Sequence, residues 1–133
     1  MKKIAITVIL VITAVLSVFP ATYGLSVAGG GSYVFQSMGY LDALMNKGFF
    51  PDQIVGTSMG SVVAYYMAGG YYPVQVYNMF SILDFSKFFE MSFPVNGGIV
   101  NTAAFGDLLY YTTKIDSFDK FMVPVKFGTV NLN

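Results

Sequence analysis

The chain has 133 residues, of which 55% are hydrophobic and 17% aromatic, so it has the size of one domain and enough apolar side chains for a packed core. Seven Lys and seven acidic residues leave no formal net charge, and there is no Arg and no basic run beyond Lys2-Lys3, which argues against nucleic acid as a partner. Because Cys and His are absent and the carboxylates form no calcium-loop pattern, we expect no metal and no cofactor.

The first 24 residues have the organisation of a signal peptide. Lys2-Lys3 precedes an uncharged, mostly apolar stretch over residues 4–19, and Pro20 leads into small residues at 21–24. As a helix the apolar stretch would be about 24 Å long, which is less than the hydrocarbon core of a bilayer. We therefore expect residues 1–24 to export the chain to the periplasm or out of the cell. The alternatives are a membrane anchor, and a buried strand or core helix at the start of the domain.

A glycine loop follows this segment. Residues 25–28 are typical of a short apolar strand, and they lead directly into Gly29-Gly30-Gly31. Residues 33–47 then show helical spacing and end at Gly48, a typical residue after a helix. The apolar positions of this helix are Val34, Met38, Leu41 and Met45. The loop is either an anion-binding site at a helix N-terminus or a tight turn with a helix cap.

The pentapeptide Gly56-Thr57-Ser58-Met59-Gly60 is the clearest motif in the chain. Pro51-Asp52 predicts a turn, and residues 53–55 predict a strand that ends at this G-x-S-x-G sequence. Residues 61–67 are apolar on nearly all sides, which predicts a buried helix. Strand, serine turn and helix in this order are the context of a nucleophile elbow, in which the serine occupies a strained turn between close-packed glycines.

The rest of the chain continues the alternation of helices and strands. Pro73 opens a third helix with Val76, Met79 and Phe80 on one side, and residues 84–93 predict either a short helix or an irregular apolar segment. Further expected elements are a turn at 96–98, a helix at 103–111 with Phe105, Leu108 and Leu109 as its apolar stripe, and a strand within 123–130. Strands that alternate with helices predict an α/β fold, with a mainly parallel sheet flanked by helices on both faces.

Three stretches near the N-terminus resemble the start of a patatin-like phospholipase domain: residues 25–31, the helix end Asn46-Lys47-Gly48, and residues 51–60. Residues 84–89, 97–100 and 123–132 resemble later parts of that domain in the same order. The resemblance therefore covers residues 25–133. It implies a three-layer α/β/α fold of which this chain is the N-terminal portion.

The resemblance also implies the chemistry of a lipid acyl hydrolase, a phospholipase or esterase that uses a Ser-Asp dyad. Ser58 would attack the acyl carbonyl, and the backbone N–H groups of Gly30 and Gly31 would bind the oxyanion. The dyad needs no metal and no cofactor. The implied partners are a lipid or ester substrate and a membrane surface. The remaining motif residues are Gly29, which is expected to serve the turn itself, Gly56 and Gly60.

Two departures from the family pattern affect this assignment. Ser32, Tyr33 and Val34 stand where the family usually has a basic residue and another glycine. The dyad aspartate of the family lies in an Asp-Gly-Gly or Asp-Gly-Ala motif, and this sequence has no Asp-Gly dipeptide. We therefore expect the dyad aspartate to lie outside these residues and the chain alone to hydrolyse esters poorly or not at all. The aspartates expected to be surface, turn or capping residues are Asp42, Asp52, Asp84, Asp107, Asp116 and Asp119.

Two other functions remain open. The first is a non-catalytic lipid-binding or interaction protein that retains the fold, which the missing aspartate and the altered glycine loop favour. The second is an ordinary α/β-hydrolase whose histidine lies beyond residue 133. That fold generally places several strands before its elbow, and this sequence offers one after the signal segment, so the second alternative is the weaker.

Overall fold

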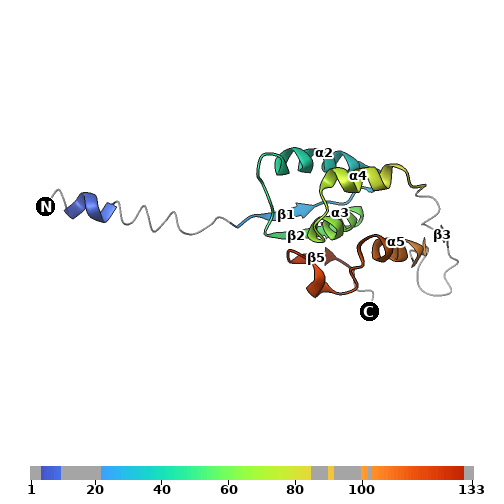
Figure 1. Cartoon of the computed structure of the whole chain (residues 1–133). Coiled ribbons are helices and arrows are strands. Elements are labelled where there is room, and N and C mark those ends of the chain that lie inside the picture. The colour runs from blue at the N-terminus through green and yellow to red at the C-terminus, as the bar shows by residue number, and fades with distance from the viewer. Residues whose placement is uncertain (1–3, 10–21, 85–89, 92–99, 102, 131–133) are drawn as a thin grey trace.

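The computed structural model describes residues 4–9, 22–84, 90–91, 100–101 and 103–130 (Figure 1). Residues 4–9 are helical. The other elements, in chain order, are β1 (Gly24–Val27), the 3₁₀ turn η1 (Gly31–Tyr33), α2 (Val34–Met45), β2 (Gln53–Thr57), α3 (Met59–Ala68), α4 (Pro73–Ser81), β3 (Glu90–Met91), β4 (Val100–Asn101), α5 (Ala103–Thr113), the 3₁₀ turn η3 (Phe118–Lys120) and β5 (Val125–Gly128).

Three parallel strands form the main sheet, in the order β1-β2-β5. Val27, Gly56 and Phe127 lie side by side across it, one residue from each strand. Because the strands are parallel, their carboxyl ends meet at one edge of the sheet, and the glycine loop and Ser58 follow β1 and β2 at that edge. The topology therefore brings together two motifs that are separated by a whole helix in the sequence.

The helices pack on one face of this sheet. Both connections, from β1 to β2 and from β2 to β5, move the chain in the same direction across the sheet, so right-handed crossovers place their helices on the same side. Helix α3 lies against β2, and α2 packs against α4. In Figure 1, α3 lies between the α2/α4 pair and β5. The expected α/β fold with a parallel sheet flanked by helices is confirmed.

The opposite face of the sheet is exposed in the described part of the chain. Ser26, Val55 and Lys126 pair across the three strands and all three are exposed, whereas Ile54 and Val125 on the helix side are buried. The described residues therefore form two of the three layers that the sequence analysis predicted, the sheet and one layer of helices.

The buried core is centred on α3. Seven of its ten residues are buried, which confirms the prediction of a helix that is apolar on nearly all sides. The predicted stripes of the neighbouring helices also face the core: Met38 and Leu41 of α2, Val76 and Phe80 of α4, and Phe105 of α5 are buried. Each such side chain contributes about 1.5–3 kcal/mol relative to an exposed position.

The sequence prediction differs from the structure in the region before α5. Residues 84–93 were expected to be a short helix or an irregular segment, but Glu90–Met91 form β3 and pair with β4 in an antiparallel ladder. A two-residue strand is too short to show an alternating pattern, so the sequence carries no signal for it. The rest of that segment after Asp84, and the turn expected at 96–98, lie outside the described residues.

The N-terminal helix over residues 4–9 falls within the expected signal segment. Ile4, Ile6 and Ile9 are all strongly exposed. Within the ranges that the structure describes, none of the helices combines the length and the apolar character that a membrane span requires.

Candidate active site

The backbone of Ser58 has a conformation that L-amino acids rarely adopt. Its φ is 52° and its ψ is −132°, and it stands between the last residue of β2 and the first residue of α3. A non-glycine residue in such a region stores about 1–3 kcal/mol of strain, which persists only where the surrounding packing enforces it. Ser58 is exposed and makes no side-chain hydrogen bond to the helix that it precedes. Its hydroxyl is therefore held outside the core with no hydrogen-bonding role in capping α3.

Gly56 and Gly60 make this conformation possible because each lies where a side chain would collide with backbone. A Cβ atom at position 56 would lie 2.6 Å from Gly60 O and 2.6 Å from Ser61 Cα. At position 60 it would collide with the carbonyl oxygens of Val27 and Ala28. The end of β1 and the first turn of α3 thus pack against each other without intervening side chains.

The glycine loop lies directly against Ser58. A Cβ atom at position 29 would lie 2.7 Å from Ser58 Cβ and 3.4 Å from Ser58 Oγ. Gly29 was expected to serve the turn itself, and the structure gives it a second requirement, the close approach to Ser58. The left-handed conformations belong to Gly30, with φ 137°, and Gly31, with φ 59°, whereas Gly29 is required for the close approach to the serine.

The backbone at Gly30 and Gly31 offers N–H donors and open space beside the serine. Tyr33 N–H donates to Gly30 O at 3.2 Å, and no backbone acceptor within the described ranges takes the N–H of Gly30 or Gly31. Both glycines are exposed, and a Cβ at position 31 would meet nothing within 4 Å. The arrangement provides two N–H donors and room for a ligand at the start of a helical segment.

Comparison with known proteins connects this geometry to a family. The family model described as patatin-like phospholipase matches residues 25–130, which include β2, β5, all of β1 but its first residue, the glycine loop and the elbow. The chain belongs to the patatin-like phospholipase family. A search of curated proteins found no match.

Membership confirms the predicted resemblance and defines the general chemistry. Patatin-like proteins are lipid acyl hydrolases, and the family implies lipid substrates. The matched region contains Ser58, Gly30 and Gly31.

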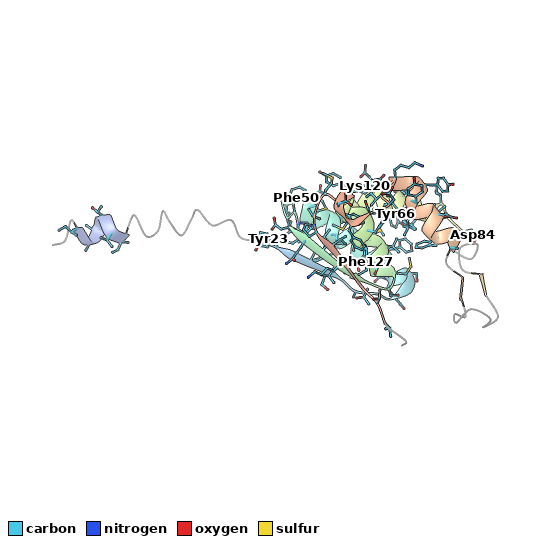
Figure 2. All side chains as sticks on the ribbon, turned by 90° about the horizontal axis from the view of Figure 1, so that it is seen from below. Tyr23, Phe50, Tyr66, Asp84, Lys120 and Phe127 are labelled. Carbon is cyan, nitrogen blue, oxygen red and sulfur yellow. The ribbon has the colours of Figure 1, made fainter. Side chains whose placement is uncertain are left out.

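Five of the six aspartates of the patatin-like chain are placed away from the serine or engaged with other partners (Figure 2). Asp52 accepts a hydrogen bond from Tyr23 N–H at 2.7 Å, before the start of β2 and therefore at the opposite edge of the sheet. In Figure 2, Tyr23 lies at one end of the sheet and Asp84, beyond α4, at the other end of the molecule. Asp84 is exposed.

Other aspartates interact with neighbours in sequence. Asp42 accepts a hydrogen bond from Asn46 Nδ2 at 3.1 Å. Asp116 Oδ1 lies 2.7 Å from Lys120 Nζ, and this hydrogen bond holds the pKa of the Asp116 carboxyl below its usual value. A hydrogen bond from Ser117 lowers the pKa of Asp119 in the same way. Among the described residues, no aspartate is hydrogen-bonded to Ser58.

The sequence did not predict which residues surround the first turn of α3. Ser61 follows the nucleophile candidate by three residues, and Leu109 and Phe127 reach the same helix from α5 and β5. The spacing of Ser58 and Ser61 is the one local signal for this neighbourhood, since residues three apart share a side of a helix. The sequence identifies Leu109 and Phe127 as apolar positions. It contains no local pattern that predicts their contact with α3.

Proposed function

We propose that this chain carries the nucleophile and the oxyanion loop of a lipid acyl hydrolase. Ser58 Oγ attacks the acyl carbonyl, its proton passes to a base, and the alcohol leaves with a proton to give an acyl-enzyme that water then hydrolyses. The observation that carries the proposal is the strained, exposed backbone of Ser58 between two glycines that have no room for a side chain. Backbone strain of this kind clusters at functional sites, and Ser58 makes no capping hydrogen bond that would account for it.

The backbone N–H groups of Gly30 and Gly31 are the proposed oxyanion donors. This role is supported by the contact of Gly29 with Ser58, which places the loop next to the reacting oxygen, and by the lack of a backbone acceptor for these donors within the described ranges. In comparable sites each donor contributes about 3 kcal/mol to the stabilisation of the tetrahedral intermediate. These donors act through the backbone, so the replacement of a cationic side chain by Ser32 leaves them in place.

The general base of the dyad is proposed to be none of the six aspartates of these 133 residues. The hydrogen bonds of Asp42 and Asp52 and the ion pair of Asp116 support this. A serine with no base within reach has little nucleophilicity at neutral pH. We expect the purified chain to hydrolyse p-nitrophenyl butyrate little above the buffer rate, with Ser58→Ala as the control. Turnover comparable to an ordinary esterase that disappears in Ser58→Ala would show that the base is present.

A lipid-binding protein without catalysis is the second candidate, favoured by the same lack of a hydrogen-bonded aspartate at Ser58. The two candidates differ in whether a reactive ester leaves an acyl group covalently attached to Ser58. An acyl hydrolase lacking its base retains a slow acylation of Ser58 by p-nitrophenyl butyrate, which intact mass spectrometry detects as an added butyryl group. A lipid-binding protein gives no adduct that depends on Ser58 while still sedimenting with phospholipid vesicles.

Export by residues 1–24 is proposed as the route by which the domain reaches its lipid. The basic start, the apolar stretch and the exposed isoleucines of the helix over residues 4–9 support it. Expression in a bacterium, followed by N-terminal sequencing of the exported fraction, tests the proposal. Recovery of a chain that begins near residue 25 is the expected result. Recovery of the intact chain in the membrane fraction would favour the anchor instead, and recovery of the intact chain in the cytoplasm would exclude both.

A further inference from the structure

A groove of about 250 Å³ lies next to the elbow, between α3, α5 and β5. Phe127, labelled in Figure 2, comes from β5, beside the helix layer. The groove is on the helix-covered face of the sheet, since Phe127 pairs in register with the buried Gly56. Its lining residues are Ser61, Val62, Tyr65, Phe105, Leu109 and Phe127.

The groove is continuous with the first turn of α3, where the nucleophile candidate lies. Ser61 is one of the lining residues, and Ser61 N–H donates to Ser58 O at 2.8 Å. Ser58 and Ser61 are three residues apart, less than one turn of a helix, so a chain attached to a carbonyl at Ser58 Oγ has only this turn to pass before it reaches the groove.

The lining is chemically suited to an alkyl chain. No charged side chain contributes to it, and apart from Ser61 its side chains are aliphatic or aromatic. The one further polar atom, the Tyr65 hydroxyl, is already bound to Thr113 Oγ1 at 2.8 Å and to Ile115 O at 2.9 Å. We propose that this groove binds the acyl chain of the substrate; the proposal rests on the function of Ser58 proposed above.

The size of the groove sets the length of chain that it accommodates. A methylene group takes up about the same space as a water molecule in the liquid, about 30 Å³, so 250 Å³ accommodates about eight of them. The groove therefore matches an acyl chain of medium length. Each additional buried methylene raises affinity about fourfold until the groove is full.

Tyr65 lies between the groove and a neighbouring hollow. Tyr65 and Phe127 also line a second hollow of about 170 Å³, whose other walls include Phe118 and Phe121. The Tyr65 ring is fixed between the two hollows by its two hydrogen bonds and by an edge contact with Phe121, whose ring centroid lies 5.2 Å away. Tyr65 is thus the residue that determines chain length, and its removal joins the two hollows.

Binding of saturated fatty acids of 4 to 16 carbons tests this assignment by calorimetry, below the concentration at which they form micelles. The measurement uses the chain with Ser58→Ala, so its outcome does not depend on catalysis. Affinity is expected to rise with length and level off near eight carbons. Leu109→Trp should fill the groove and lower the affinity for octanoate at least tenfold. Tyr65→Ala should move the plateau to longer chains, while Tyr65→Phe, which keeps the ring, should leave it unchanged.

A second measurement needs no substitution in the groove. Octanoic acid carrying a terminal diazirine is irradiated with the chain, and adducts are expected on residues 105–109 or at Phe127. Adducts confined to other segments would overturn the proposal, as would a Leu109→Trp chain that melts like its parent and binds octanoate equally well. If the groove binds octanoate but Ser58 proves unreactive, the proposed nucleophile fails while the acyl-chain site stands.

Discussion

The two ends of α3 use polar groups in opposite ways. At its N-terminus Ser58 is strained and exposed and makes no side-chain capping hydrogen bond. Toward its C-terminus Tyr65 and Tyr66 donate or accept hydrogen bonds with Thr113 and Thr112 of α5, at 2.8 and 2.7 Å. Tyr66 is fully buried, and this burial raises the pKa of its hydroxyl.

This contrast indicates that the domain gains stability at the C-terminal part of α3 and loses some stability at the elbow. The tyrosine–threonine contacts satisfy polar groups at a helix–helix interface and so fix α5 against α3. The elbow keeps a strained backbone and an unengaged hydroxyl, which the close-packed glycines enforce. We infer that the interior end of α3 provides the rigidity that holds the strained end in place.

Gly60→Ala should have the largest effect, because it attacks the packing that enforces the elbow. The new methyl group would collide with the carbonyl oxygens of Val27 and Ala28, and β1 and α3 would have to separate. We expect a loss of about 3 kcal/mol in the free energy of unfolding, measured by urea denaturation.

Gly39→Ala is the matched control for that substitution. Gly39 lies inside α2, and a Cβ there would meet nothing within 4 Å. Alanine at this position should stabilise the protein by about 0.5–1 kcal/mol, since glycine is the poorer helix former. Equal destabilisation by the two substitutions would contradict a specific role of Gly60.

Tyr65→Phe probes the C-terminal part of α3, where the tyrosine hydroxyls are hydrogen-bonded. It removes a hydroxyl that binds both Thr113 Oγ1 and Ile115 O, so the carbonyl loses its partner, and we expect a loss of about 1–2 kcal/mol. Tyr66→Phe should cost less, because Thr112 Oγ1 still donates to the backbone of α5 after the change. Thermal unfolding of the two variants measures the difference. A larger loss of stability in Tyr66→Phe than in Tyr65→Phe would show that the burial of the hydroxyl matters more than the number of hydrogen bonds that it makes.

Ser58→Gly tests the backbone strain at the N-terminus of α3. Glycine adopts a φ of 52° without strain, so this variant should be more stable than the wild type by about 1 kcal/mol. Ser58→Ala removes the same hydroxyl but keeps the Cβ atom, and its stability should stay within about 0.5 kcal/mol of the wild type. If the two variants proved equally stable, the turn would not be strained.

The sequence was sufficient for the parts of the fold that rest on local patterns. The spacing of Val34, Met38 and Leu41 predicted the buried side of α2, and the alternation within residues 123–130 predicted β5. The proximity of Gly29-Gly30-Gly31 to Ser58 was also predictable, because the family resemblance fixed the order of strands and loops. These features depend on neighbours in sequence or on a motif of known context.

Other features depend on contacts between distant segments and had no such signal. The role of Gly29 depends on how closely β1 approaches the elbow, which only the packed structure reveals. The groove requires Leu109 and Phe127 to meet α3 across more than forty residues of chain. Likewise, the two strands β3 and β4 are each too short for a pattern to emerge.

The central claim is that Ser58 is a preorganised nucleophile that lacks only a carboxylate base. Its most direct test is the rate at which a fluorophosphonate labels the chain as formate is added to replace that base, with the adduct located by peptide mass spectrometry. We predict a single adduct on Ser58, formed faster as formate increases and absent from Ser58→Ala. Failure to label Ser58 at any formate concentration, or equal labelling of Ser61, would contradict the claim.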